Sequence, residues 1–100
     1  MSSDIPKQED GEVIDTSKEV ITIEVQLVDG DEEKFHFNAD QLVGKAKPRV
    51  LHRFHIVPPS GVVYYFAFAK GQLIDDNKTW AQQGVKTGMT ILFGTEQQVG

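Results

Sequence analysis

The segment VITIEVQL, residues 20–27, alternates between apolar and polar side chains. A period of two residues is typical of a β-strand that has one buried face. After an Asp-Gly pair that favours a tight turn, Phe35 and Phe37 continue the alternation with polar residues between them. The pattern therefore predicts a β-hairpin whose large side chains all lie on one face.

A helix is predicted over residues 47–55. Pro48 fits the first turn of a helix, because the N–H that proline lacks has no intrahelical partner there. Val50, Leu51 and Phe54 then lie on one stripe at helical spacing. The Pro-Pro pair that follows, within the sequence VPPSG, is expected to end the helix.

Two further strands complete the predicted order. The segment VVYYFAFA, residues 62–69, is rich in residues that favour strands, and MTILF, residues 89–93, is the last such segment. Leu73 and Trp80 are the apolar anchors of the polar connector between them. This order predicts an α+β fold in which a mixed sheet packs on one main helix. The residues expected to supply most of the core are Ile21, Ile23, Val25, Leu27, Phe35, Phe37, Leu51, Phe54, Phe66, Phe68, Leu73, Trp80, Ile91 and Phe93.

Charge separates the N-terminus from the rest of the chain. Residues 1–20 contain six acidic side chains and two lysines, so they carry −4 of the formal net charge of −5. Because they have no periodic apolar face, residues 1–19 are predicted to be disordered. Residues 20–94 are the expected globular domain, and residues 95–100 are a flexible C-terminal tail. The acidic arm argues against a nucleic-acid partner, since it would repel phosphates.

The composition makes several kinds of chemistry unexpected. The chain has no cysteine, which excludes disulfides, thiolate catalysis and cysteine-bound zinc and fits a reducing cytoplasm. No apolar stretch has the length of a membrane helix. His52 and His55 lie three residues apart, but no third metal ligand is suggested. We expect a soluble cytoplasmic monomer that is not an enzyme, holds no metal or cofactor and binds no membrane.

Several strings of this sequence resemble the ubiquitin family. VPPSG stands where ubiquitin has its helix-ending proline pair, and FAFAKGQLIDD resembles ubiquitin's third strand and the turn after it. The acidic N-terminal arm and the hairpin LVDGDEEKFHF resemble SUMO. Residues 21–100 are therefore similar to divergent ubiquitin-like or SUMO-like β-grasp protein modifiers, bacterial ubiquitin-like proteins among them. The resemblance implies a β-grasp fold.

The resemblance also implies a chemistry for the C-terminus. In the family, the carboxylate of the last glycine, here Gly100, is adenylated by an activating enzyme, passed to conjugating enzymes and joined to an amine of a target protein. A processing protease is a further implied partner, and Gln97, Gln98 and Val99 would contact the activating machinery. Ubiquitin and SUMO end in two glycines, whereas this chain has Val99 before Gly100. That departure favours divergent partner enzymes.

The alternative function is a protein-interaction module that is not conjugated. Basic residues on or near the predicted helix and second strand are either a solvated face or a docking surface for acidic residues that flank an extended peptide. Such a peptide would add to the second strand through unpaired backbone groups. The residues of this predicted groove are Lys34, His36, Lys45, Lys47, Arg49 and Arg53.

Overall fold

The alternating segments form the predicted hairpin. In the computed structural model, which describes residues 14–100, β1 spans Val20–Leu27 and β2 spans Glu32–Asn38. The two strands pair antiparallel, with Ile23 opposite Phe35. Because both side chains lie on the same face of the hairpin, that face is apolar throughout and must be covered.

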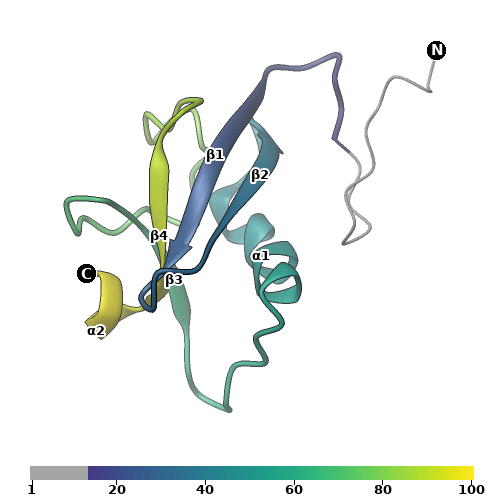
Figure 1. Cartoon of the computed structure of the whole chain (residues 1–100). Coiled ribbons are helices and arrows are strands. Elements are labelled where there is room, and N and C mark those ends of the chain that lie inside the picture. The colour runs from purple at the N-terminus through teal and green to yellow at the C-terminus, as the bar shows by residue number, and fades with distance from the viewer. Residues whose placement is uncertain (1–13) are drawn as a thin grey trace.

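The other two strands complete a mixed sheet. β3 spans Tyr64–Phe68 and β4 spans Thr90–Thr95. β4 lies in the centre, parallel to β1 and antiparallel to β3, so the strand order is β2-β1-β4-β3. Helix α1 covers one face of this sheet (Figure 1). The predicted α+β fold, with a mixed sheet packed on one main helix, is confirmed.

The covering helix starts with a tighter turn than the sequence predicts. A 3₁₀ turn, η2, spans Val43–Ala46 and continues directly into α1 at Lys47–Arg53, with Pro48 in the first turn as predicted. The helix buries Val50 completely and leaves Leu51 only partly buried. Val50 of the predicted stripe is therefore confirmed as buried, whereas Leu51 and Phe54 are only partly buried and Arg49 is buried beside Val50.

Helix α1 ends in a left-handed residue. His55 has a φ of 58°, and the Ile56 N–H donates to the carbonyl of Leu51 at 2.9 Å. This is the hydrogen bond of a helix C-terminus that usually carries glycine, because a side chain in the left-handed region costs about 1 kcal/mol.

Replacing His55 by glycine should therefore stabilise the domain by about 0.5–1 kcal/mol. The measurement is the midpoint of urea unfolding, with the slope unchanged. His52→Gly is the matched control, since His52 is an exposed residue inside α1 and glycine there should destabilise by about the same amount. Two shifts of the same sign would contradict this account of the helix end.

The core lies between the sheet and α1, and aromatic rings occupy its centre. Trp80 is fully buried and stacks on Phe37, with ring centroids 5.0 Å apart, and it meets the Phe66 ring edge to face. Most of the predicted core is confirmed. Six further residues belong to the buried core, namely Ala39, Val43, Ala46, Val50, Ile74 and Val85, of which Val50 lies on the predicted helical stripe. Five predicted core residues are only partly buried, namely Leu27, Leu51, Phe54, Phe68 and Leu73.

Residues that precede β1 also contact the domain. Ile14 is buried, and the Asn38 side chain holds the backbone of Asp15 through two hydrogen bonds. The Ser17 hydroxyl donates to the Asp15 carboxylate at 2.6 Å, and this bond holds the pKa of Asp15 below its ordinary value of 3.8. Residues 14 and 15, which fall within the predicted disordered arm, are therefore in contact with the domain. Its first 13 residues lie outside the described part of the chain.

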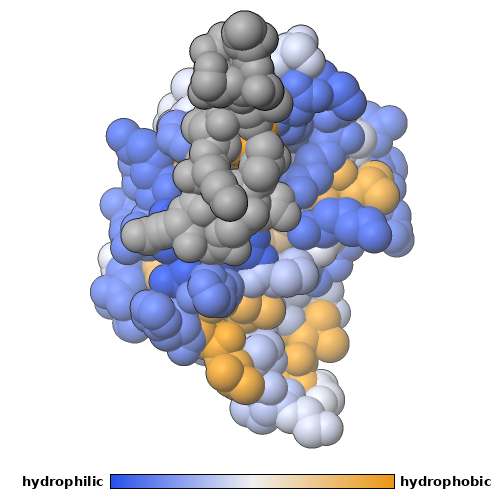
Figure 2. Space-filling view, turned by 90° about the vertical axis from the view of Figure 1, so that its right-hand side faces the viewer, coloured by the Kyte–Doolittle hydropathy of each residue, from blue (hydrophilic) through white to orange (hydrophobic). Residues whose placement is uncertain are grey.

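The loop between α1 and β3 carries exposed apolar side chains. Val57 is 90% exposed, and Val62 and Val63 are also exposed. Figure 2 shows hydrophobic atoms gathered at the end of the molecule where this loop projects. Within residues 14–100, no helix is long and apolar enough to cross a membrane.

Candidate functional site

The last residues of the chain form a helical turn. Helix α2 spans Glu96–Val99 directly after β4. Thr95 and Gln98 form a capping box, in which the Thr95 N–H donates to the Gln98 side-chain oxygen at 2.9 Å. The Gly100 N–H donates to the carbonyl of Glu96 at 2.8 Å. The sequence predicts a flexible tail over 95–100, whereas the structure folds these residues back.

The turn is held against the face of the sheet opposite α1. Gly94 lies on that face, and a Cβ placed there would be 2.7 Å from the Gln98 side-chain oxygen and 3.1 Å from Cγ1 of Val99. Val99 is only 5% exposed. Figure 1 shows α1 and α2 on opposite sides of the sheet. The predicted contact residues Gln97, Gln98 and Val99 therefore differ in environment, because Val99 is buried and the two glutamines are exposed.

The stability of α2 is a balance of small terms. Burial of a valine side chain stabilises by about 1.5–3 kcal/mol, and a helix cap by about 1 kcal/mol. Ordering the backbone costs about 1–2 kcal/mol for each residue. A helix of four residues has no intrinsic stability in water. The turn exists because it packs on the sheet, so a small change in that packing decides whether it forms.

Gly100 ends beside the loop that follows β3. A Cβ on Gly100 would lie 2.9 Å from the Glu96 carbonyl oxygen and 3.3 Å from Cδ2 of Leu73. The Val99 carbonyl oxygen approaches Gly71, where a Cβ would be 3.7 Å away. The predicted conjugation residue therefore lies in a defined place, although Gly100 itself is exposed.

The predicted basic groove is mostly occupied by contacts within the chain. Arg49 is buried, lies over the Phe35 and Phe37 rings, and donates to the carbonyl of His36 at 2.7 Å. Arg53 donates to the carbonyl of Lys34 at 3.3 Å. These two arginines therefore cover backbone acceptors on the open edge of β2.

The backbone carbonyls of Lys34 and His36 point away from the sheet because of the way β1 is paired. The Thr22 carbonyl accepts from the Gly88 N–H, and the Glu24 N–H donates to the Met89 carbonyl. Because those β1 groups face β4, the opposite residues on β2 direct their backbone groups away from the sheet. An incoming strand would need these carbonyls as acceptors.

The remaining groove residues do not form one surface. Lys47 pairs with Asp76 and lies over the Tyr65 ring, on the β3 side of the domain. Lys34 and Lys45 are exposed, and the His36 ring is hydrogen-bonded to the Thr22 hydroxyl at 2.8 Å. The structure thus gathers Lys34, His36 and the two arginines at the β2 edge and separates Lys47 from them.

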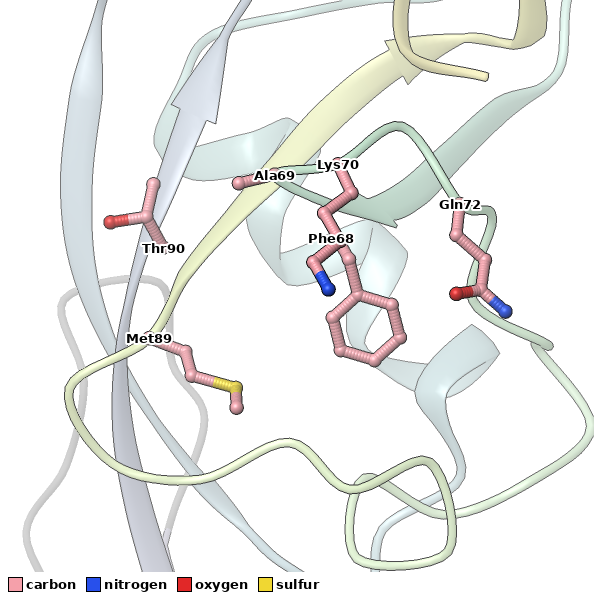
Figure 3. Close-up of a pocket in the computed structure, with 6 residues that line it drawn as sticks. All are labelled: Phe68, Ala69, Lys70, Gln72, Met89 and Thr90. Atoms are coloured by element: carbon pink, nitrogen blue, oxygen red, sulfur yellow. The ribbon is translucent and has the colours of Figure 1, made fainter.

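A hollow of about 440 Å³ lies near the start of β4. Phe68 and Met89 supply its apolar wall, and Lys70 and Gln72 lie on its rim (Figure 3). The residues that line this hollow include no acidic side chain and no histidine. In the part of the chain that the structure describes, no three histidine, cysteine, aspartate or glutamate side chains are grouped as metal ligands.

The arrangement of strands and helix is shared with known structures. No protein-family model matches the sequence, and no curated protein matches it. Ubiquitin from Caldiarchaeum subterraneum superposes with a TM-score of 0.64 at 19% identity, covering 77% of this chain and 94% of that one. The fold is the ubiquitin β-grasp.

Two other similar structures have different origins. The N-terminal ubiquitin-like domain of the 4931431F19Rik protein superposes with a TM-score of 0.65 at 18% identity, covering 90% of this chain and 86% of that one. A structure described as molecular mimicry of SUMO that promotes DNA repair has a TM-score of 0.63 at 14% identity, covering 74% of this chain and 89% of that one. At these identities the likeness shows the β-grasp fold alone.

Two residues of the C-terminal site are not predicted as site residues. Gly94 is needed for close packing of α2, and Leu73, predicted only as a core anchor, lies beside Gly100. Nothing in their neighbouring residues indicates a contact with the end of the chain. The segment Thr95 to Gln98 does match the capping-box pattern, in which a threonine is followed three residues later by a glutamine. That pattern could have predicted the helical turn.

Proposed function

We propose that this β-grasp chain is a protein modifier, joined to its targets through the carboxylate of Gly100. The observation that supports the proposal most is the position of Gly100, one helical turn beyond the last strand. Residues 96–100 could reach at most about 17 Å when extended. Glycine adds no side chain to block a narrow active site. The proposal requires Gly100 to carry a free carboxylate, either native or released by a processing protease.

The chemistry would be supplied by partner enzymes. A carboxylate is a poor electrophile, so an activating enzyme would let a Gly100 oxygen attack the α-phosphorus of ATP, with pyrophosphate leaving. A thiol of a partner enzyme then attacks the acyl carbon and displaces AMP. Finally, an amine of the target displaces the thiol, loses a proton and forms an amide bond. The chain itself acts as a substrate in each step.

The proposed setting is the cytoplasm. The first step consumes ATP, and a chain without cysteine needs no oxidising compartment to form disulfides. The proposed partners are activating and conjugating enzymes, a processing protease and protein targets. One of the similar structures is described as a ubiquitin, and another as a ubiquitin-like domain within a larger protein. The fold is compatible with conjugation and with a binding role.

Intact mass analysis of the chain, incubated with ATP and its cognate partner enzymes, tests the proposal. Wild type should form covalent adducts whose mass is the sum of the two proteins minus one water. A chain that ends at Val99 should form none, because its reactive residue is different. The melting curve of the shortened chain should remain cooperative, which excludes unfolding as the cause. Equal adduct yields from both chains would overturn the proposal.

The second candidate is an interaction module that is not conjugated. Burial of Val99 against the sheet favours it, because the last turn of the chain then has a structural use. Such a module would bind an extended, acidic peptide at the β2 edge, near Lys34. Amide shifts of β2 on titration with that peptide, lost at high salt and unchanged when Gly100 is deleted, would support this candidate.

A further inference from the structure

We infer that α2 is a C-terminal latch. In its closed state, the one described here, the turn holds Gly100 against the domain. In its open state, residues 96–100 are extended and the carboxylate can enter another protein. The latch itself is a property of the domain, whereas its effect on conjugation rests on the proposed function. The two can therefore be tested separately.

The surface of β4 on which α2 packs includes Gly94, a position without a side chain. Gly94 is buried, its φ is not in the left-handed region, and it sits within β4, so no backbone requirement calls for glycine there. Instead, a Cβ at Gly94 would meet Gln98 and Val99 at distances shorter than ordinary contact. The absence of a side chain at this position is what lets α2 lie flat on the sheet.

Helix α2 contacts β4, β3 and the loop after β3, and two hydrogen bonds within the turn keep its shape. The capping box holds its first residues, the Gly100 N–H holds the last, and Val99 supplies the buried apolar group. β4 already ends at Thr95, and the pairing of Thr95 with Tyr64 lies within the sheet. Opening therefore breaks the contacts of α2 and costs no strand pairing. Local opening of this kind is far easier than global unfolding.

The closed state conceals the segment that a partner must grasp. A site that accepts an extended tail binds only the open fraction of molecules, so its apparent affinity is lowered by that fraction. Any change that opens the latch, without altering residues 95–100, should therefore raise the reactivity of Gly100. Conversely, a partner that grips the extended tail uncovers Val99 and the sheet face around Gly94.

Gly94→Ala is the informative variant, because it lies in the body of the domain and leaves the tail sequence intact. Thr90→Ala is the matched control on the same strand and the same face, away from α2. Amide order parameters of residues 96–100 report the latch directly. In wild type they should approach the value of about 0.85 for rigid backbone, and in Gly94→Ala they should fall below about 0.6. Thr90→Ala should match wild type.

Release of Gly100 by a carboxypeptidase gives a second measure, because exopeptidases require an extended end. The rate should rise at least about tenfold in Gly94→Ala, in proportion to the open fraction, and stay unchanged in Thr90→Ala. Val99→Ser removes the buried apolar group and provides a second opened variant for the order parameters. A mobile tail in wild type, or an unchanged tail in both opened variants, would overturn the latch.

Neither readout needs the partner enzymes. If the order parameters and the carboxypeptidase rates change as expected but no adduct forms with cognate enzymes, the latch stands and the modifier proposal fails. If adducts form at equal rates in wild type and Gly94→Ala, while the tail of wild type is mobile, the modifier proposal stands and the latch fails.

Discussion

Replacing Trp80 by alanine should cost the domain about 3–5 kcal/mol of its free energy of unfolding. The side chain is fully buried and contacts both Phe37 and Phe66. The backbone here also ties the connector to the segment before α1, because the backbone N–H of Trp80 donates to the Gln41 carbonyl and that of Ala81 to the Ala39 carbonyl. Alanine keeps both of these bonds, so the expected loss comes from the side chain. Since small domains have about 5–15 kcal/mol in total, this single change removes a large part of the stability.

Trp80→Phe is the matched comparison. The indole N–H of Trp80 is buried without a hydrogen-bond partner in the structure, and an unmade bond of this kind costs about 1–3 kcal/mol. Phenylalanine removes that N–H and keeps an aromatic ring, so the loss of volume is partly offset. We expect a cost below about 1.5 kcal/mol. Urea unfolding followed by circular dichroism measures both variants, and a similar large loss for both would show that ring packing is not what matters.

The strands were the most predictable part of the fold. In β1, every second residue is aliphatic, and the structure buries Ile21, Ile23 and Val25 as this alternation requires. Neighbouring side chains on a strand point to opposite faces, so the sequence of the strand itself determines which residues share the buried face. Trp80 was equally predictable as the large apolar residue in a polar stretch, which has few other ways to attach to a core.

Helix α1 was less predictable, since its orientation depends on residues outside it. Val50 and Leu51 are both apolar, and the helical period alone does not decide which of them meets the sheet. The η2 turn and the contact of Gly44 with Asp76, where a Cβ would lie 3.0 Å from the Asp76 Cβ, fix the rotation of α1. Such contacts join residues far apart in the sequence, so they cannot be predicted from a local pattern.

The candidate site shows the same division. The capping box of α2 is a local pattern and can be found in the sequence. The role of Gly94 cannot be found in the sequence, because it depends on the packing of Gln98 and Val99 against this position. Arg49 was predicted as part of a solvent-facing basic groove, but its long side chain reaches back over two phenylalanine rings and is buried. An arginine can extend its charged group into solvent or lay it over buried rings. Which of the two occurs depends on the residues of the neighbouring strand, here Phe35 and Phe37.

Arg49→Ala should destabilise the domain by about 3 kcal/mol. The variant loses a charged hydrogen bond to the His36 carbonyl, worth about 1.5–3 kcal/mol, and the contact of the guanidinium with the Phe37 ring, 4.8 Å from its centroid. Arg49→Lys keeps the charge but loses the planar group that stacks on the rings, and should cost about half as much. Lys45→Met removes the same charge from an exposed position and should change the stability by less than about 0.5 kcal/mol.

The two Arg49 substitutions should strengthen peptide binding, although they destabilise the domain. An extended peptide that pairs with β2 needs the His36 carbonyl, which Arg49 occupies. Arg49→Ala frees this acceptor, so at a temperature where the variant remains folded it should bind a strand-adding peptide more tightly than wild type. Arg49→Lys should lie between them, while Lys45→Met should bind an acidic peptide only slightly more weakly. Titrations followed by the amide shifts of Lys34 and His36 measure this order. Weaker binding by Arg49→Ala would mean that the arginine grips the peptide and does not guard the edge of the sheet.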